Sequence, residues 1–300
     1  MRRRNLLILV EKELIEASRN RLILGFGSVF FLLAAAMSLL GFLSPGATDV
    51  QLSRVGVSLL NLAILLVPLI GLVIGSQGFA GEFEDGTMEL LLTQPVELRD
   101  ICLGRVLGQW VAVAAALLAG FGASGLILVL VSADQQLLPF LVNLVISLIL
   151  AFVFLTLGSV ISLKAKNRMM ALLGALGVWF LAVILYDATV TQLLMALSGF
   201  PIMLVLYGFL ALNPADLLRV LAIRLSGVNL LFGPATEAMA ALPGFKGPLL
   251  SLLTIVLWSF GGYVAMLRGL RHRIFPPARR RVKDAGGKSF QTIPDERSVN

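Results

Sequence analysis

Long apolar stretches separated by short polar segments dominate the chain. Six of them run over 22–43, 55–79, 106–131, 138–163, 169–194 and 249–267. Each has about the ~20 apolar residues that a helix needs to cross the ~30 Å hydrocarbon core of a bilayer. The pattern predicts an all-α, multi-pass membrane protein with six transmembrane helices.

A seventh apolar run, 200–212, is short and begins next to Pro201, so its length fits either a short span or a re-entrant segment. The basic residues distinguish the two. With six spans, 20 of the 24 Lys and Arg residues fall on the side of both termini. A seventh span would move the nine that follow position 267 to the opposite side, against the positive-inside rule. We therefore expect six spans in a bacterial inner membrane, with both termini cytoplasmic.

The segments outside the spans have different characters. Residues 1–21 begin like a signal peptide, but their apolar run is five residues long where a signal needs ~7–15. We interpret them as an amphipathic elbow helix on the membrane surface. The transmembrane domain is expected over 22–270, with a cytoplasmic loop at 81–104 and a periplasmic segment at 186–247. The basic remainder, 271–300, has a composition typical of disorder.

Within the periplasmic segment, Tyr186 and Asp187 follow the fifth span and are expected at the membrane interface, where aromatic residues are enriched. Further along, Asn213 or Asp216 is a candidate N-cap for a short helix with Pro214 at its first turn.

Composition supports a membrane protein and weakens other classes. Only 14% of the 300 residues are charged, against ~25% in an average soluble domain. The formal charge of +7 lies at the ends and between apolar runs rather than on an aromatic-interleaved face, so no nucleic-acid partner is expected. The single cysteine, Cys102, excludes an intramolecular disulfide and a cysteine-based metal cluster.

Fragments that imitate catalytic motifs lack their partners. Ser124 lies in a Gly-x-Ser-Gly sequence, yet the only histidine, His272, follows the last span. Asp187 has no second intramembrane aspartate motif. The Gly-Gly-Lys-Ser sequence ending at Ser289 lacks the first glycine of a phosphate-binding loop, because Val282 stands there. We therefore expect no enzymatic activity, cofactor or metal site in this chain.

The loop between the second and third spans is the most informative segment. Its carboxylates are six of the chain's seventeen: Glu82, Glu84, Asp85, Glu89, Glu97 and Asp100. After a turn at Gly86, Thr87 is a candidate N-cap for a short helix that ends before Pro95. A second short helix, 98–103, is expected to lead into the third span, with Arg105 at the lipid boundary. Physics alone leaves two interpretations open: a solvated interfacial helix, or a coupling element that fits a groove on a partner.

One motif in this loop matches a known family. The pattern Glu82-x-x-x-Gly86-Thr87-x-Glu89-x-Leu91-Leu92-x-x-Pro95, followed by Leu103-Gly104-Arg105, resembles the segment that identifies ABC-2 type permeases of ABC transporters. Glu11-Lys12-Glu13-Leu14 with Arg19-Asn20-Arg21 resembles the elbow that opens these proteins. The resemblance extends over about residues 5–270.

Within the family, the chain is similar to the permease of the nitrous oxide reductase maturation system. The matching pieces are Tyr186-Asp187 and Asn213-Pro214-Ala215-Asp216-Leu217-Leu218-Arg219. The chain departs from that permease in its apolar 200–212 insert and its extended basic tail.

The resemblance implies a type V exporter-like fold with an elbow helix and a cytoplasmic coupling helix. Two separate ATPase subunits, which bind ATP and Mg, would drive a dimer with a second permease copy, exporting or coupling mechanically toward a periplasmic partner such as a copper enzyme under maturation. The implied ATPase-coupling residues are Glu82, Glu84, Asp85, Gly86, Thr87, Glu89, Leu91, Leu92, Pro95 and Arg105. Tyr186, Asp187, Asn213, Pro214, Asp216 and Arg219 are the implied periplasmic set. The alternatives are an exporter of lipid-like or hydrophobic compounds and, from another class, a membrane scaffold or an intramembrane enzyme.

Overall fold

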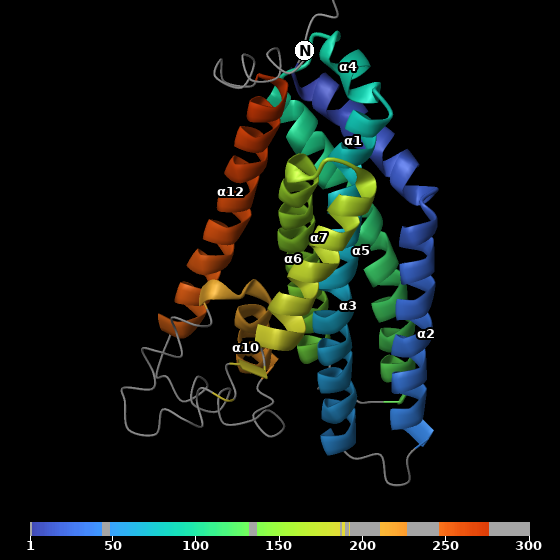
Figure 1. Ribbon diagram of the computed structural model, residues 1–300. Helices are drawn as coiled ribbons and strands as arrows, with labels where there is room; N and C mark the ends of the chain where they lie inside the picture. Colours follow the sequence, from blue (N-terminus) through green and yellow to red (C-terminus); the bar gives the residue numbers. More distant parts are fainter. Residues whose placement is uncertain are drawn as a thin grey trace, which may run out of the picture.

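The computed structural model describes residues 2–43, 49–131, 137–186, 188–189, 192, 211–226 and 246–275. The secondary structure elements in these ranges are helices (Figure 1). In chain order they are α1 (Arg2–Ser18), α2 (Arg21–Leu43), α3 (Asp49–Glu84), α4 (Thr87–Leu92), α5 (Leu98–Val131), α6 (Leu137–Lys164), α7 (Arg168–Trp179), the π-helix η2 (Phe180–Leu185), α10 (Pro214–Ser226) and α12 (Lys246–Ile274).

Within the described ranges, six helices are long and apolar enough to cross a membrane, which confirms the predicted number. They are α2, α3, α5, α6, α7 with its continuation η2, and α12. Of the seventh apolar run, residues 201–210 lie outside the described residues, so its re-entrant or spanning nature stays a prediction.

The centre of the bundle is the pair α3 and α6, which pack against each other along most of their length. Their backbones approach closely where glycines face each other. A Cβ added to Gly75 would lie 2.3 Å from the Leu155 carbonyl oxygen, and one added to Gly158 would lie 2.6 Å from that of Leu72. Small residues are used in this way at membrane helix interfaces, because lipid provides little hydrophobic drive for association.

This contact predicts that alanine substitutions at two glycines differ strongly in their effect on stability. We expect Gly75→Ala to destabilise the protein by about 1–3 kcal/mol, since the new methyl group must push two helix backbones apart. Gly25→Ala in α2 is the matched control, because a Cβ there meets nothing within 4 Å. Thermal unfolding of the two variants in detergent measures the difference, and equal melting temperatures would contradict the close approach.

One end of the bundle gathers α1, α4 and the C-terminal end of α12 (Figure 1). There the Arg273 guanidinium donates hydrogen bonds to the carbonyls of Ser162, Leu163 and Ala165, at 3.1, 3.1 and 2.8 Å. Ser162 and Leu163 belong to the last turn of α6, where carbonyls have no partner within the helix, and Ala165 follows its end. Residues 271–274, which the sequence suggested as the start of a disordered tail, are therefore helical, while 276–300 lie outside the described residues.

The short helix expected at 98–103 is not separate. Residues from Leu98 to Val131 form one continuous helix, α5. Nothing breaks it at Gly104, because that glycine lies against Leu9 of α1 rather than at a turn. The loop between α3 and α5 therefore carries one short helix, α4.

Candidate functional site

The turn between α3 and α4 depends on Gly86. This residue has φ of +74°, a conformation in which glycine alone avoids a steric cost, and it stands at the N-cap position of α4. The prediction that Thr87 caps the helix is wrong: Thr87 is the first helical residue, and its hydroxyl donates to the Glu82 carbonyl at 3.4 Å. The helix ends at Leu92, ahead of Pro95 as expected.

The six residues of α4 divide between a buried and an exposed side. Met88 is fully buried and Leu91 packs beside it, whereas Leu90 is 68% exposed and Leu92 and Glu89 are also exposed. We call Glu89, Leu90 and Leu92 the outer face of α4. The sequence suggested Leu91 and Leu92 as the partner-facing pair; in the structure Leu91 points inward and Leu90, which was not singled out, points outward.

Met88 connects α4 to four longer helices. It inserts into a buried cluster contributed by α3, α5, α6 and α12: Phe79, Ile101, Cys102, Val106, Leu163, Met266 and Leu270. A displacement of α4 therefore presses on all four helices, because protein interiors are close-packed and transmit strain.

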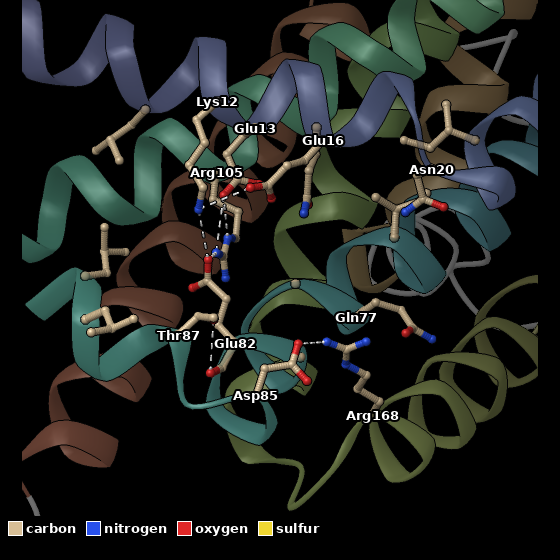
Figure 2. Close-up of a pocket in the computed structure, with 18 of the residues that line it drawn as sticks. Lys12, Glu13, Glu16, Asn20, Gln77, Glu82, Asp85, Thr87, Arg105 and Arg168 are labelled. Carbon is tan, nitrogen blue, oxygen red and sulfur yellow. Dashed lines mark hydrogen bonds and ion pairs between the residues drawn. The ribbon is translucent and has the colours of Figure 1, made fainter.

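Arg105 is buried beneath this loop, with 3% of its surface exposed. It donates to Glu13 Oε1 at 3.3 Å from Nε and 3.2 Å from Nη2, and it forms an ion pair with Glu82 (Figure 2). Its guanidinium also lies over the Phe79 ring at 4.2 Å. The sequence placed Arg105 at the lipid boundary, and its level in the membrane stays a prediction. Its side chain lies inside the protein, held by two carboxylates that could not be buried without a cation.

The N-terminal helix completes this ionic network. Lys12 lies 3.4 Å from Glu82, so α1 supplies both a cation and, through Glu13, a carboxylate. Helix α1 can approach α5 this closely because Gly108 of α5 has no side chain. A Cβ added to Gly108 would lie 2.4 Å from the Glu13 Cβ. We call Lys12, Glu13, Glu82 and Arg105 the ionic network; it joins α1, α3 and α5.

A second contact ties the loop to the turn between α6 and α7. The backbone N–H of Arg168 donates to Glu84 Oε2 at 2.8 Å, and its guanidinium pairs with Asp85 (Figure 2). The turn is ordered by Asn167, whose side chain accepts from the Met170 N–H at 2.8 Å and caps α7. Three loop carboxylates that the sequence assigned to a partner thus have partners within the chain, and Glu89 remains on the outer face.

The opposite end of the bundle brings together three of the residues predicted for the periplasmic segment. Asn213 donates to the Ala182 carbonyl at 2.6 Å and to Asp216 at 2.8 Å, and Arg219 lies 3.3 Å from Asp216. Ala182 belongs to η2, and π-helical turns of this kind are frequent at functional sites. Asn213 Oδ1 also accepts from the Ala215 N–H at 3.1 Å, so Asn213 caps α10, with Pro214 as its first residue.

Tyr186 lies next to this group. Burial, reinforced by the nearby charge of Asp216, raises the pKa of Tyr186 to about 12, so the phenol is neutral at physiological pH. Asp187 lies outside the described residues.

The sequence indicated the loop but not the residues elsewhere in the chain that pair with it. From the sequence, Glu13 was noted only as part of an elbow, and Arg168 was not singled out. One signal was present for Glu13: a carboxylate between the apolar positions Leu9 and Leu14 has to find a cation if that face is buried. No local signal indicates that Arg105 is its partner.

Comparison with known proteins agrees with this architecture. The ABC-2 family transporter protein family matches residues 7–267. A probable ABC transporter permease protein NosY of Pseudomonas aeruginosa is 34% identical over 271 residues, which cover 88% of this chain and 97% of that protein. The protein of the same name from Stutzerimonas stutzeri is 34% identical over 255 residues, or 83% and 90% of the two chains. The chain therefore belongs to the ABC-2 transporter family, as a permease subunit similar to NosY.

Proposed function

We propose that this permease is driven by two cytoplasmic ATPase subunits that dock on the outer face of α4, and that two copies of the chain form the membrane part of the complex. The observation that carries the proposal is the division of α4, with Met88 fully buried and Leu90 68% exposed. An apolar residue on a short, rigid helix offers a partner an anchor, and the buried residue beside it connects that anchor to the bundle.

The proposed mechanism is mechanical. Closure of the ATPase subunits on ATP would push α4, and Met88 would transmit the push to α3, α5, α6 and α12. Glu84 and Asp85, held by Arg168, would carry the same motion to the start of α7. ATP hydrolysis takes place in the partner subunits in this scheme, and the chain itself supplies only the coupling and the pathway.

The direction of action is proposed from the relatives. The similarity to NosY extends over almost its whole length, which supports a role as the permease of an ABC transporter. From the resemblance to the permease of the nitrous oxide reductase maturation system, we propose export or mechanical coupling toward a periplasmic partner. The Asn213, Asp216 and Arg219 group, at the end of the bundle away from α4, is the proposed periplasmic side of the coupling.

The direct test is to purify the affinity-tagged chain from its native membranes. We expect an ATPase subunit to co-purify in about equal amount and to hydrolyse ATP. Deletion of the gene should then leave nitrous oxide reductase of the same cells without its full copper content. An active ATPase with an unaffected reductase would favour the exporter of hydrophobic compounds, and no ATPase at all would contradict the proposal.

Topology gives an independent check. We propose a bacterial inner-membrane location with both termini cytoplasmic, since 20 of 24 basic residues then lie inside. The native Cys102 is fully buried and gives little background for labelling with an impermeant thiol reagent. In intact cells we expect Asn5→Cys and Phe290→Cys to be protected and Leu230→Cys to react. Labelling at position 290 from outside would contradict the six-span topology.

A further inference from the structure

A charged pocket of about 660 Å³ lies between α1, α4, α5 and the end of α3 (Figure 2). Its walls carry charges of both signs: the cations Lys12, Arg105 and Arg168 and the carboxylates Glu13, Glu16, Glu82 and Asp85. Arg105, Glu13 and Glu82 are committed to one another in the interior. Lys12 pairs with Glu16 at 3.4 Å and Arg168 pairs with Asp85, but all four side chains remain 44–58% exposed, so both pairs can also contact a molecule in the pocket.

A second hollow, an apolar groove of about 620 Å³, lies between α2 and α5. Its lining combines small residues with larger apolar ones: Gly27, Ser28, Ala112, Ala115, Ala116 and Ala119 with Leu14, Ile23, Leu24, Phe31 and Leu32. Leu24, Phe31 and Leu32 are among the exposed apolar residues of a helix that is long and apolar enough to cross the membrane. We call this hollow the α2–α5 groove.

The two hollows adjoin at Ile23, which lines both. From Ile23 to Leu32 the groove follows α2 over nine residues, or about 14 Å at 1.5 Å per residue. The hydrocarbon core of a bilayer is ~30 Å thick, so this length is close to that of one leaflet. A charged pocket at the start of a helix span, continued by an apolar groove one leaflet long, matches the shape of a phospholipid.

We propose that a phospholipid with a primary ammonium headgroup occupies these two hollows, in the leaflet on the α1 side. One acyl chain lies in the α2–α5 groove. The headgroup enters the charged pocket, where Lys12 and Arg168 face its phosphate and Glu16 and Asp85 face its ammonium. This lipid is a bound structural component and not the transported substrate. Leu90, the proposed ATPase anchor, also lines the charged pocket, so lipid binding is measured on the chain without the ATPase.

Charge distinguishes this occupant from others. The pocket has four carboxylates and three cations, so an anionic headgroup would meet a net negative charge, while a headgroup with both signs finds a partner for each. A quaternary choline cannot donate the charge-assisted hydrogen bonds that a primary ammonium gives to a carboxylate. A second copy of the chain could cover the groove with an apolar helix, but such a helix would leave the charged pocket unmatched.

The experiment is native mass spectrometry of the full-length chain, purified in detergent and exposed to phosphatidylethanolamine, phosphatidylcholine or phosphatidylglycerol with the same acyl chains. We expect phosphatidylethanolamine to be retained about tenfold better than either other lipid, because only it satisfies both sets of charges. Glu16→Gln should reduce this preference while leaving total lipid binding in place. Equal retention of the three lipids by the native chain would overturn the headgroup assignment.

The groove is tested by Ala115→Leu. Ala115 lines the groove and is exposed, so the larger leucine side chain would occupy part of the groove without disturbing buried residues. We expect about tenfold weaker retention of every lipid, since contact with one or two methylene groups is lost. Ala265→Leu on the exposed side of α12 is the matched control and should bind lipid normally. Unchanged lipid binding by Ala115→Leu would overturn the proposal, and a loss of self-association with unchanged lipid would assign the groove to a second copy instead.

Discussion

Glu89→Lys and Leu90→Asp on the outer face of α4 are expected to abolish co-purification of the ATPase while the permease still inserts and folds. Both side chains are exposed, so neither change disturbs the packing of α4 itself. In a complex, inverting a charge that has a buried partner costs ~2–5 kcal/mol. Removing an apolar anchor costs a further ~1.5–3 kcal/mol. Glu89→Lys should therefore weaken ATPase capture by at least about 30-fold and Leu90→Asp by at least about 10-fold, as measured by detergent pull-down and by coupled ATP hydrolysis.

Gly86→Val tests the same element through its backbone. The φ of +74° at Gly86 is unfavourable for a β-branched residue, and the strain of about 1–3 kcal/mol should rotate or unwind α4. Gln135→Lys, between α5 and α6, is the control and should leave capture unchanged. If all three loop variants bound the ATPase like the native chain, α4 would be an ordinary connector and the proposed coupling would be wrong.

The second large effect is expected at Arg105. Replacing this buried guanidinium with methionine leaves Glu13 and Glu82 close together inside the protein without their principal cation. Breaking a buried ion pair in this way costs ~3–5 kcal/mol. We therefore expect Arg105→Met to lower the melting temperature strongly and to release α1 from α5, which limited proteolysis of the N-terminal helix would detect.

Two further variants distinguish the effect of unpaired buried charges on stability from the effect of removing an arginine side chain. Arg168→Met removes an arginine whose ion pair with Asp85 is about half exposed, and exposed pairs contribute only ~0–1 kcal/mol. The triple variant Glu13→Gln, Glu82→Gln, Arg105→Met removes the buried charges together and should recover much of the lost stability. Equal melting of Arg105→Met and Arg168→Met would mean that the ionic network does not hold α1 in place.

Several features could be predicted from the sequence because they depend on residues close together in the chain. A run of about twenty apolar residues determines a membrane-spanning helix by itself, and six such runs appear as six helices. The positive φ at Gly86 and the end of α4 before Pro95 follow from the backbone freedom of glycine and the constraint that proline puts on its predecessor. The capping of α10 by Asn213 is equally local, since donor and acceptor are two residues apart.

The direction in which side chains of the loop point was decided only by the tertiary structure. Met88, Leu90, Leu91 and Leu92 are all apolar, so the sequence of this short helix does not determine which of them faces inward. The cavity offered by α3, α5, α6 and α12 selects Met88. Glu82 and Glu89 are both carboxylates of one loop, yet Glu82 is drawn inward because Arg105 lies below it. The partner that buries Arg105, Glu13, is 92 residues away. Pairing over that distance depends on how α1 packs across α5, which no local pattern contains.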